Sequence, residues 1–234
     1  IQTGKPLWNI LPATRDTAFG NKVRQLRKFA AGSKLSSVDR YWNWAGYASP
    51  EEIEKLMISG DFYVNDKNKK IYTSGFSPNG SFNEVLRADM ELVLEGDMLV
   101  KVDRMSMLNG LEVRPPFLDH DVVDYVMQLP AQYKIEAGER KKILRDAFSG
   151  LLPAEIYSRK KQGFEVPLLK WFKGELSGMI EELLNEKLLR EQNIFHPEEV
   201  RKIRNQMNSG NSGDSVARIW ALIVFQKWWK KNIA

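Results

Sequence analysis

The sequence of 234 residues contains no cysteine and only two histidines, His120 and His196. The lack of cysteine excludes disulfides, thiolate zinc sites and a cysteine nucleophile. Two histidines also argue against a histidine-rich metal site, so we expect no metal bound to this chain alone. No apolar run approaches the roughly 20 residues that span a bilayer, and the N-terminus has no signal-peptide pattern. We therefore expect a cytoplasmic protein with no membrane partner.

Charge of one sign does not dominate the sequence, although its net charge is +5 and its pI is about 9.2. A basic pI raises the question of nucleic acid. The 35 basic residues are interleaved with 30 acidic ones, so we expect no nucleic-acid partner. Residues 227–231, which read KWWKK, fit core tryptophans followed by a charged terminus. A nucleic-acid binder stays an alternative, and it would require retention on DNA or RNA with a steep salt dependence.

Helical periodicity dominates the chain, and no repeat or low-complexity tract interrupts it. Seven tryptophans and eleven phenylalanines favour a folded core. The pattern predicts one helical domain over residues 1–234, with a break at Gly96-Asp97 and one small hairpin at most, around residues 65–68. Cap and periodicity signals predict helices over residues 17–31, 36–44, 50–57, 82–94, 97–109, 119–129, 139–148, 167–172, 176–189, 197–209 and 214–231.

Common catalytic motifs are missing from the sequence. It has no phosphate-binding glycine loop, no HExxH motif and no serine nucleophile elbow. Composition and periodicity alone therefore predict only a helical domain. Two segments stand out from that background.

The first segment, residues 102–120, mixes charges with apolar residues that we expect to be half-buried, namely Val102, Met105 and Met107. Half-buried charges are costly unless they are paired. The candidate site residues of this segment are Asp103, Arg104, Glu112 and Arg114. A structural ion-pair network that ties a helix to a loop is the alternative interpretation, favoured for the last two. Asp119 is better explained as a helix cap than as a ligand.

The second segment, residues 159–167, reads RKKQGFEVP and places three cations beside Gly163. Such a loop between two helices can close over an anion, because a lysine ammonium suits phosphate oxygens. A solvated basic loop is the simpler interpretation from these residues alone.

These segments, in this order, resemble motifs of the glutamine-hydrolysing asparagine synthetase family. That family shows a pattern like VDRxSMxxxLExRxPFLDH, followed by LPxxIxxRxKxGFxxP. Residues 102–107 read VDRMSM, residues 111–120 read LEVRPPFLDH, and residues 152–164 read LPAEIYSRKKQGF. Residues 141–145 (KKILR) and 215–220 (SVARIW) also fit the family pattern. The resemblance is strongest over residues 85–175.

The resemblance implies a mainly α fold, a helical bundle that forms the C-terminal part of an α/β synthetase domain of the ATP-pyrophosphatase type. It implies a parent enzyme that adenylates aspartate with ATP and Mg²⁺ and amidates it with ammonia derived from glutamine. Lys161 matches the family lysine that stabilises negative charge as pyrophosphate departs. The other four candidates would lie near the nucleotide and acyl pocket without an assigned role.

Several family segments are absent from this sequence: the N-terminal cysteine of the glutaminase domain, the SGGxDS loop and the acidic GEGxDE segment. We therefore expect a fragment that begins after them, is inactive alone and binds no ATP or Mg²⁺ by itself. Its partners would be the glutaminase domain and the ATP-binding part of the same polypeptide, and an uncovered apolar face would favour self-association into a homo-oligomer.

Two further functions stay open. Some members of the family amidate or cyclise other carboxylates, such as sugars, peptides or antibiotic precursors, and the substrate-specific residues are not readable here. A non-catalytic helical binding module is the more remote alternative.

Overall fold

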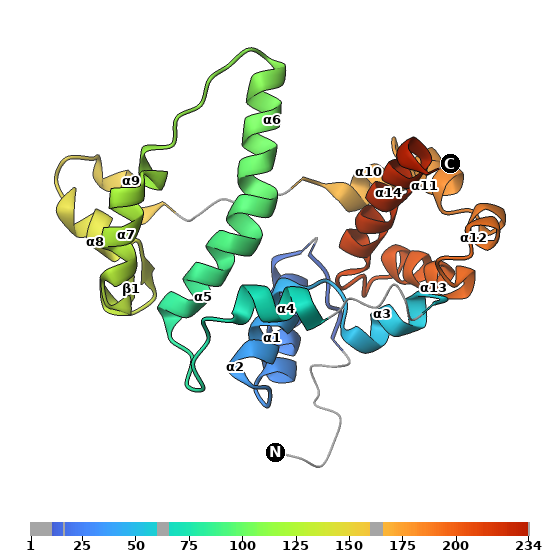
Figure 1. Ribbon diagram of the computed structural model, residues 1–234, viewed down its shortest axis with the longest axis horizontal. Helices are drawn as coiled ribbons and strands as arrows, with labels where there is room; N and C mark the ends of the chain where they lie inside the picture. Colours follow the sequence, from blue (N-terminus) through green and yellow to red (C-terminus); the bar gives the residue numbers. More distant parts are fainter. Residues whose placement is uncertain (1–10, 16, 60–65, 160–165, 234) are drawn as a thin grey trace. The chain divides into compact units, whose positions relative to one another are not determined.

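The structure is a computed structural model that describes residues 11–15, 17–59, 66–159 and 166–233. The chain forms two compact units, unit 1 (Ile1–Asn68 and Glu165–Ala234) and unit 2 (Lys69–Phe164). Helices dominate both units, so the expected mainly α fold with one small hairpin is confirmed (Figure 1). The expectation that residues 1–234 form one domain stays a prediction. Each of the two units is compact by itself, and each is described separately below.

Unit 1 contains two groups of helices. The first comprises α1 (Ala18–Gly32), α2 (Ser37–Ala45) and α3 (Pro50–Leu56); the second comprises α10 (Leu168–Lys173), α11 (Ser177–Leu183), α12 (Glu186–Gln192), α13 (Pro197–Asn208) and α14 (Ser215–Asn232). Side-chain caps start several of them: the Thr17 hydroxyl accepts from Gly20 N, and Ser49, the predicted N-cap of α3, forms a capping box with Glu52. Pro197 occupies the first turn of α13.

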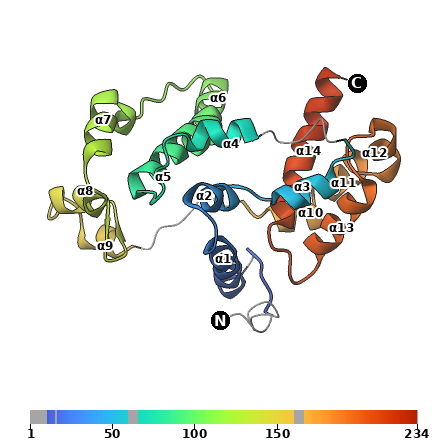
Figure 2. The same cartoon turned by 60° about the horizontal axis from the view of Figure 1, so that its bottom comes forward.

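The core of unit 1 lies among α10 to α14, which gather in one group (Figure 2). Its buried members are Phe172, Ile180, Leu183, Leu184, Leu189, Ile194, Phe195, Val200, Met207, Ile219, Leu222 and Ile223. An antiparallel bridge between Met57 and Phe195 attaches the end of α3 to this group. The core therefore joins segments that are far apart in the sequence.

Unit 2 is built around a long helical stretch made of α5 (Phe82–Asp89), the π-helix η3 (Met90–Leu99) and α6 (Val100–Leu108). It continues through the short helices η4 (Pro116–Leu118), α7 (His120–Gln128), η5 (Ala131–Tyr133), α8 (Lys142–Ala147) and α9 (Ala154–Ser158). The strands β1 (Ile135–Glu136) and β2 (Glu139–Arg140) pair between η5 and α8. The helix α4 (Asp66–Thr73) contains the point in the sequence where unit 1 gives way to unit 2.

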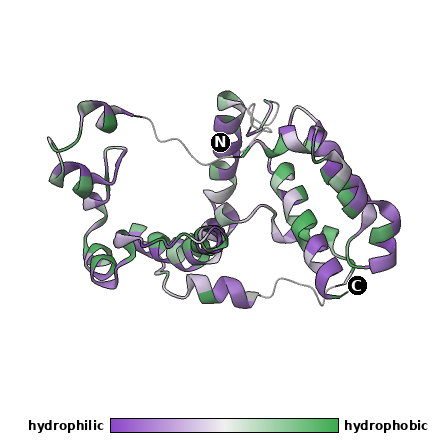
Figure 3. Cartoon of the chain, turned by 90° about the horizontal axis from the view of Figure 1, so that it is seen from above, coloured by the Kyte–Doolittle hydropathy of each residue, from purple (hydrophilic) through white to green (hydrophobic). Residues whose placement is uncertain are grey.

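Unit 2 has little core of its own. Of its described residues only Thr73 and Ala88 are buried, while many large apolar side chains are exposed. Hydrophobic residues, green in Figure 3, recur along the helices of both units. No helix in the described part of the chain is long and apolar enough to cross a membrane.

Two predictions about strands and breaks are wrong. Residues 66–73 form α4 and not the second half of a hairpin, because a helix satisfies its own backbone whereas a lone hairpin is marginal; residues 62–65 lie outside the described part. The predicted break at Gly96-Asp97 is bridged by η3, since one glycine costs a helix only about 1 kcal/mol.

The hairpin lies instead at residues 135–140, where the turn residues Ala137 and Gly138 have φ angles of 48° and 85°. This left-handed turn suits a two-residue hairpin. The helix predicted from Glu139 consequently begins only at Lys142. The helix predicted over residues 176–189 is also interrupted, because the Asn185 side chain caps a new helix by accepting from Leu188 N.

Candidate functional site

The four described candidates from the first motif all lie in unit 2 and all are exposed. Asp103 and Arg104 are consecutive residues of α6, and within the described residues neither side chain has a hydrogen bond or ion pair. The helix ends at Leu108 with Asn109 as its C-cap, and Gly110 follows with a φ of 67°, as the sequence predicted. Both charged groups are therefore open to solvent or to a ligand.

Glu112 and Arg114 form an ion pair with each other, with 2.6 Å between Arg114 Nε and Glu112 Oε1. The two side chains are 69% and 85% exposed. Such a pair contributes little to stability in water. It joins two residues of one extended stretch and does not tie a helix to a loop, which was the structural alternative.

The apolar neighbours of these charges are exposed and not half-buried. Val102 is 43% exposed, Met105 54% and Met107 61%. That expectation is wrong because unit 2 provides no packed layer over this face of α6. Asp119, by contrast, caps α7 as predicted, with its carboxylate accepting from Asp121 N at 3.0 Å.

Lys161 lies outside the described residues, and so do its neighbours from 160 to 165. The helices on either side are described. Before Lys161, Arg145 holds α9 by donating from Nη2 to Tyr157 O at 2.8 Å, and its guanidinium lies 5.7 Å from the centre of the Tyr157 ring. After Lys161, α10 is anchored by the buried Phe172.

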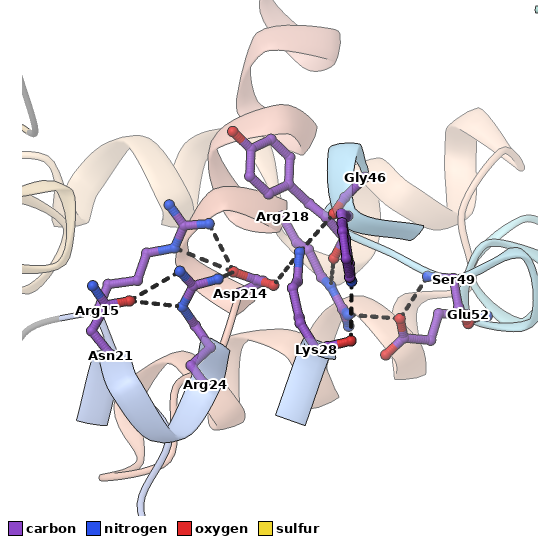
Figure 4. A network of polar contacts seen from close by, with 11 residues as sticks. Arg15, Asn21, Arg24, Lys28, Gly46, Ser49, Glu52, Asp214 and Arg218 are labelled. Carbon is purple, nitrogen blue, oxygen red and sulfur yellow. Dashed lines mark hydrogen bonds and ion pairs between the residues drawn. The ribbon is translucent and has the colours of Figure 1, made fainter. Parts of the chain in front are cut away.

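Sequence reasoning missed a charge cluster in unit 1 that is centred on Asp214, the residue before α14 (Figure 4). Its Oδ1 lies 2.9 Å from Arg15 Nη2 and 3.2 Å from Arg24 Nη1, and its Oδ2 lies 3.1 Å from Lys28 Nζ. The Asp214 side chain is only 8% exposed. No local motif signals this cluster, because its members are up to 199 residues apart.

The electrostatics of the cluster favour an ionised carboxylate. Burial by itself would raise the pKa of Asp214. The hydrogen bond from Arg15 and the charges of Lys28, Arg15 and Arg24 outweigh burial, so the pKa lies below its ordinary value of 3.8. Two hydrogen bonds of Ala13 support the same junction: Gly213 N donates to Ala13 O at 2.8 Å, and Ala13 N donates to the side-chain oxygen Asn211 Oδ1 at 2.8 Å.

Metal ligands do not gather anywhere in the described residues, where no group of three or more histidine, aspartate and glutamate side chains could hold an ion. The described part of the site can therefore offer cations, single carboxylates and exposed apolar surface. These groups suit binding of anions and packing against other protein.

Comparison with known proteins identifies the wider class. A family model described as asparagine synthase matches residues 5–230. The chain belongs to the asparagine synthase family, which confirms the resemblance found in its motifs. No solved structure gives a significant match.

Individual curated relatives of this chain are named as asparagine synthetases. The chain is 31% identical over 186 residues to "Asparagine synthetase [glutamine-hydrolyzing] 1" of Bacillus subtilis (strain 168), covering 78% of this chain and 29% of the relative. It is 41% identical over 91 residues to "Asparagine synthetase [glutamine-hydrolyzing]" of Gallus gallus, covering 38% of this chain and 16% of the relative. The chain thus spans less than a third of the length of these curated relatives.

Proposed function

We propose that the chain is the C-terminal part of the synthetase domain of an amidotransferase that converts aspartate to asparagine. In this proposal the helical chain completes an α/β synthetase domain of the ATP-pyrophosphatase type. The carboxylate of aspartate attacks the α-phosphorus of ATP, which releases pyrophosphate. Ammonia from glutamine then attacks the acyl carbon, and AMP leaves.

The observation that carries the proposal is the family match over residues 5–230, which contains both motif segments in order. A chance basic loop would not be expected to follow a VDRMSM and LEVRPPFLDH pattern at the family spacing. The names of the relatives point to glutamine as the source of nitrogen.

Lys161 is the proposed catalytic residue. Its ammonium would neutralise negative charge on the phosphate oxygens as the bond to pyrophosphate breaks, and a group aimed at developing charge is a large contributor to rate. The family match over residues 5–230 covers the segment RKKQGF that contains Lys161, which supports this assignment.

Asp103, Arg104, Glu112 and Arg114 are proposed to lie near the nucleotide and the acyl group. Their exposure supports this role, because each keeps its polar atoms accessible. The described residues offer no cluster of carboxylates for Mg²⁺. The ligands of the magnesium that accompanies ATP are therefore proposed to come from the GEGxDE-type segment of the parent, which this sequence lacks.

The proposed partners are the remaining segments of the same polypeptide, including the glutaminase domain. Exposed apolar side chains in unit 2 support this. They follow one another along the stretch from Met98 to Phe117: Met98, Val100, Val102, Met105, Met107, Leu108, Leu111, Val113 and Phe117. A patch of this kind is expected to be covered by protein.

The test is aspartate-dependent pyrophosphate release by the full-length parent supplied with ATP, Mg²⁺ and glutamine. We expect Lys161→Ala to lower the rate about 10²–10³-fold. Lys160→Ala is the matched control, since it removes the adjacent cation and is expected to keep near wild-type activity.

Three outcomes separate the alternatives. Loss of release in Lys161→Ala alone supports the proposal. If the wild type releases pyrophosphate only with another carboxylate, that compound is the substrate and not aspartate. Equal rates for Lys161→Ala and the wild type would return Lys161 to the solvated-loop interpretation.

A further inference from the structure

A pocket of about 500 Å³ lies beside α1 and α2 in unit 1. Its volume falls within the range of small-molecule sites. The described residues that line it are Arg15, Arg24, Gln25, Lys28, Phe29, Trp44, Ala45 and Tyr47. None of them is acidic, three are cationic and three are aromatic.

The three cations of the pocket are held in place by ion pairs with Asp214. Arg15 uses Nε and Nη2 on Asp214 Oδ1, at 3.2 and 2.9 Å. Lys28 Nζ donates to Gly46 O at 2.9 Å and pairs with Asp214 Oδ2 at 3.1 Å. Asp214 contributes one negative charge against three positive ones, so the described side chains of the cluster carry a positive surplus.

Arg15 and Lys28 also keep donors that the described residues do not use. The two N–H groups on Arg15 Nη1 and one of the three protons of Lys28 have no acceptor among those residues. The Arg15 side chain is 36% exposed and that of Lys28 is 25% exposed, so both side chains are partly open to solvent. A guanidinium beside an ammonium suits the oxygens of a phosphate or carboxylate.

The aromatic residues form flat walls next to these cations. The rings of Phe29 and Trp44 stack, with centroids 6.4 Å apart and planes 19° apart. The Tyr47 ring lies 5.6 Å from the Arg15 guanidinium carbon. All three rings are exposed, at 60%, 44% and 50%. Exposed aromatic faces beside a cation are a surface on which a planar group stacks.

The Trp44 ring is positioned by a hydrogen bond to the backbone of α1. Its Nε1 donates to Lys28 O at 3.1 Å, which couples the wall to the residue that provides a cation. Gly32 lies against the same ring, since a Cβ there would meet Trp44 Nε1 at 2.8 Å. The wall and the charges are therefore preorganised together, which lowers the cost of binding.

We propose that this pocket binds a small organic phosphate that carries a planar ring. The phosphate lies on Arg15 and Lys28, and the ring lies against Phe29 and Trp44. The proposal rests on the residues of unit 1 alone, and it can be tested on the 234-residue chain itself.

The experiment is a titration of the chain, labelled with ¹⁵N at the tryptophan indoles, with phenyl phosphate as the probe. Comparison with Trp44→Phe identifies the Trp44 indole signal. We expect a saturable shift of that signal, with inorganic phosphate and phenol binding about tenfold more weakly or worse, because each supplies only half of the contacts. Added salt weakens the binding, since the cations are partly exposed.

Two variants test the two halves of the site. Lys28→Met removes an ammonium and keeps the length of the side chain, and Phe29→Leu removes a ring that is 60% exposed. Each is expected to weaken binding about tenfold. Lys22→Met is the matched control, because Lys22 is an exposed cation of α1 that does not line the pocket.

The proposal is overturned if the Trp44 signal does not move with phenyl phosphate, or if phenol moves it equally. It is also overturned if Phe29→Leu, which leaves every ion pair in place, binds like the wild type. If Lys22→Met weakens the binding of phenyl phosphate as much as Lys28→Met does, the attraction is a non-specific effect of a basic helix. That result would also overturn the proposal.

Discussion

Arg15 Nη2 lies 2.9 Å from Asp214 Oδ1, although the two residues are 199 positions apart in the chain. The contact fastens the segment before α1 to the start of α14. Arg24 and Lys28 reach the same carboxylate from successive turns of α1. One buried aspartate therefore orients three cations that also line the pocket of unit 1.

Asp214→Asn is expected to destabilise unit 1. The substitution keeps the shape and removes the charge, which leaves three cations close together without their counter-ion. We expect a loss of about 2–3 kcal/mol in the free energy of unfolding, less than for a fully buried pair because Arg15 and Lys28 keep contact with water. Urea unfolding measures the loss. Glu182→Gln, which breaks the exposed pair with Lys230, is the control and should change little.

The ionised Asp214 carboxylate also makes the free energy of unfolding depend on pH. Its pKa in the folded chain lies below 3.8, so its stabilising effect is complete above that ordinary value and is lost as the pH falls through the folded pKa. The difference in stability between wild type and Asp214→Asn should therefore be constant near neutral pH and shrink in acid. Urea titrations at several pH values check this, and a difference that grows in acid would contradict it.

Gln192 and Gln226 exchange a pair of amide hydrogen bonds, at 2.8 and 2.7 Å. Gln226 is 1% exposed, whereas Gln192 is half-buried. We expect Gln192→Leu to cost about 1–3 kcal/mol, because it leaves the buried Gln226 amide unpaired, and Gln226→Leu to cost less. A double-mutant cycle measures the coupling, and equal costs for the two single variants would refute the asymmetry.

Asn83 joins three segments of unit 2. Its Nδ2 donates to Met127 O at 3.2 Å and Leu129 O at 3.0 Å, and its Oδ1 accepts from Lys134 Nζ at 2.6 Å. Burial lowers the pKa of Lys134 below its ordinary value, which marks this junction as partly shielded from water. We expect Asn83→Ala to cost about 1–3 kcal/mol and to speed amide hydrogen exchange at the end of α7. If amide hydrogen exchange at the end of α7 is unchanged in Asn83→Ala, the Asn83 hydrogen bonds do not stabilise that helix end.

The chain alone should not respond to nucleotide through the amidotransferase site. Millimolar Mg-ATP is expected to give no thermal upshift that survives in Lys28→Met, because the SGGxDS and GEGxDE segments are absent from the sequence. Differential scanning fluorimetry tests this. A clear upshift that survives in Lys28→Met would contradict the prediction, whereas an upshift lost in Lys28→Met would report binding at the pocket of unit 1.

Much of the helical framework was predictable because its signals are local. Ser36, Ser49 and Asp119 cap helices at the predicted starts, and α1 begins within one residue of its predicted start at Thr17. The last helix was also placed correctly. The expectation of core tryptophans at its end was only partly right: Trp229 packs against the core, but Trp228 is 51% exposed. Which side of a helix is covered depends on neighbours that periodicity does not identify.

For the candidate site, the sequence predicted the motifs and their residues but not how buried the neighbouring side chains are. The sequence singled out Asp103, Arg104, Glu112, Arg114 and Lys161, and the family match confirms the motifs that contain them without testing their roles. Their neighbours Met105 and Met107 proved exposed, because burial depends on what packs against α6. The assignment of Lys161 as a catalytic residue stays a prediction.

The sequence by itself determined the family, the start points of most helices and the absence of cysteine chemistry, since each depends on residues close together in the chain. Tertiary structure alone decided that Asp214 meets Arg15, Arg24 and Lys28, and that aromatic rings of α1 and α2 stand beside these cations. The physical reason is that ion pairs and pockets form between groups that folding brings together across long stretches of chain. No local pattern records which distant charges will share a carboxylate.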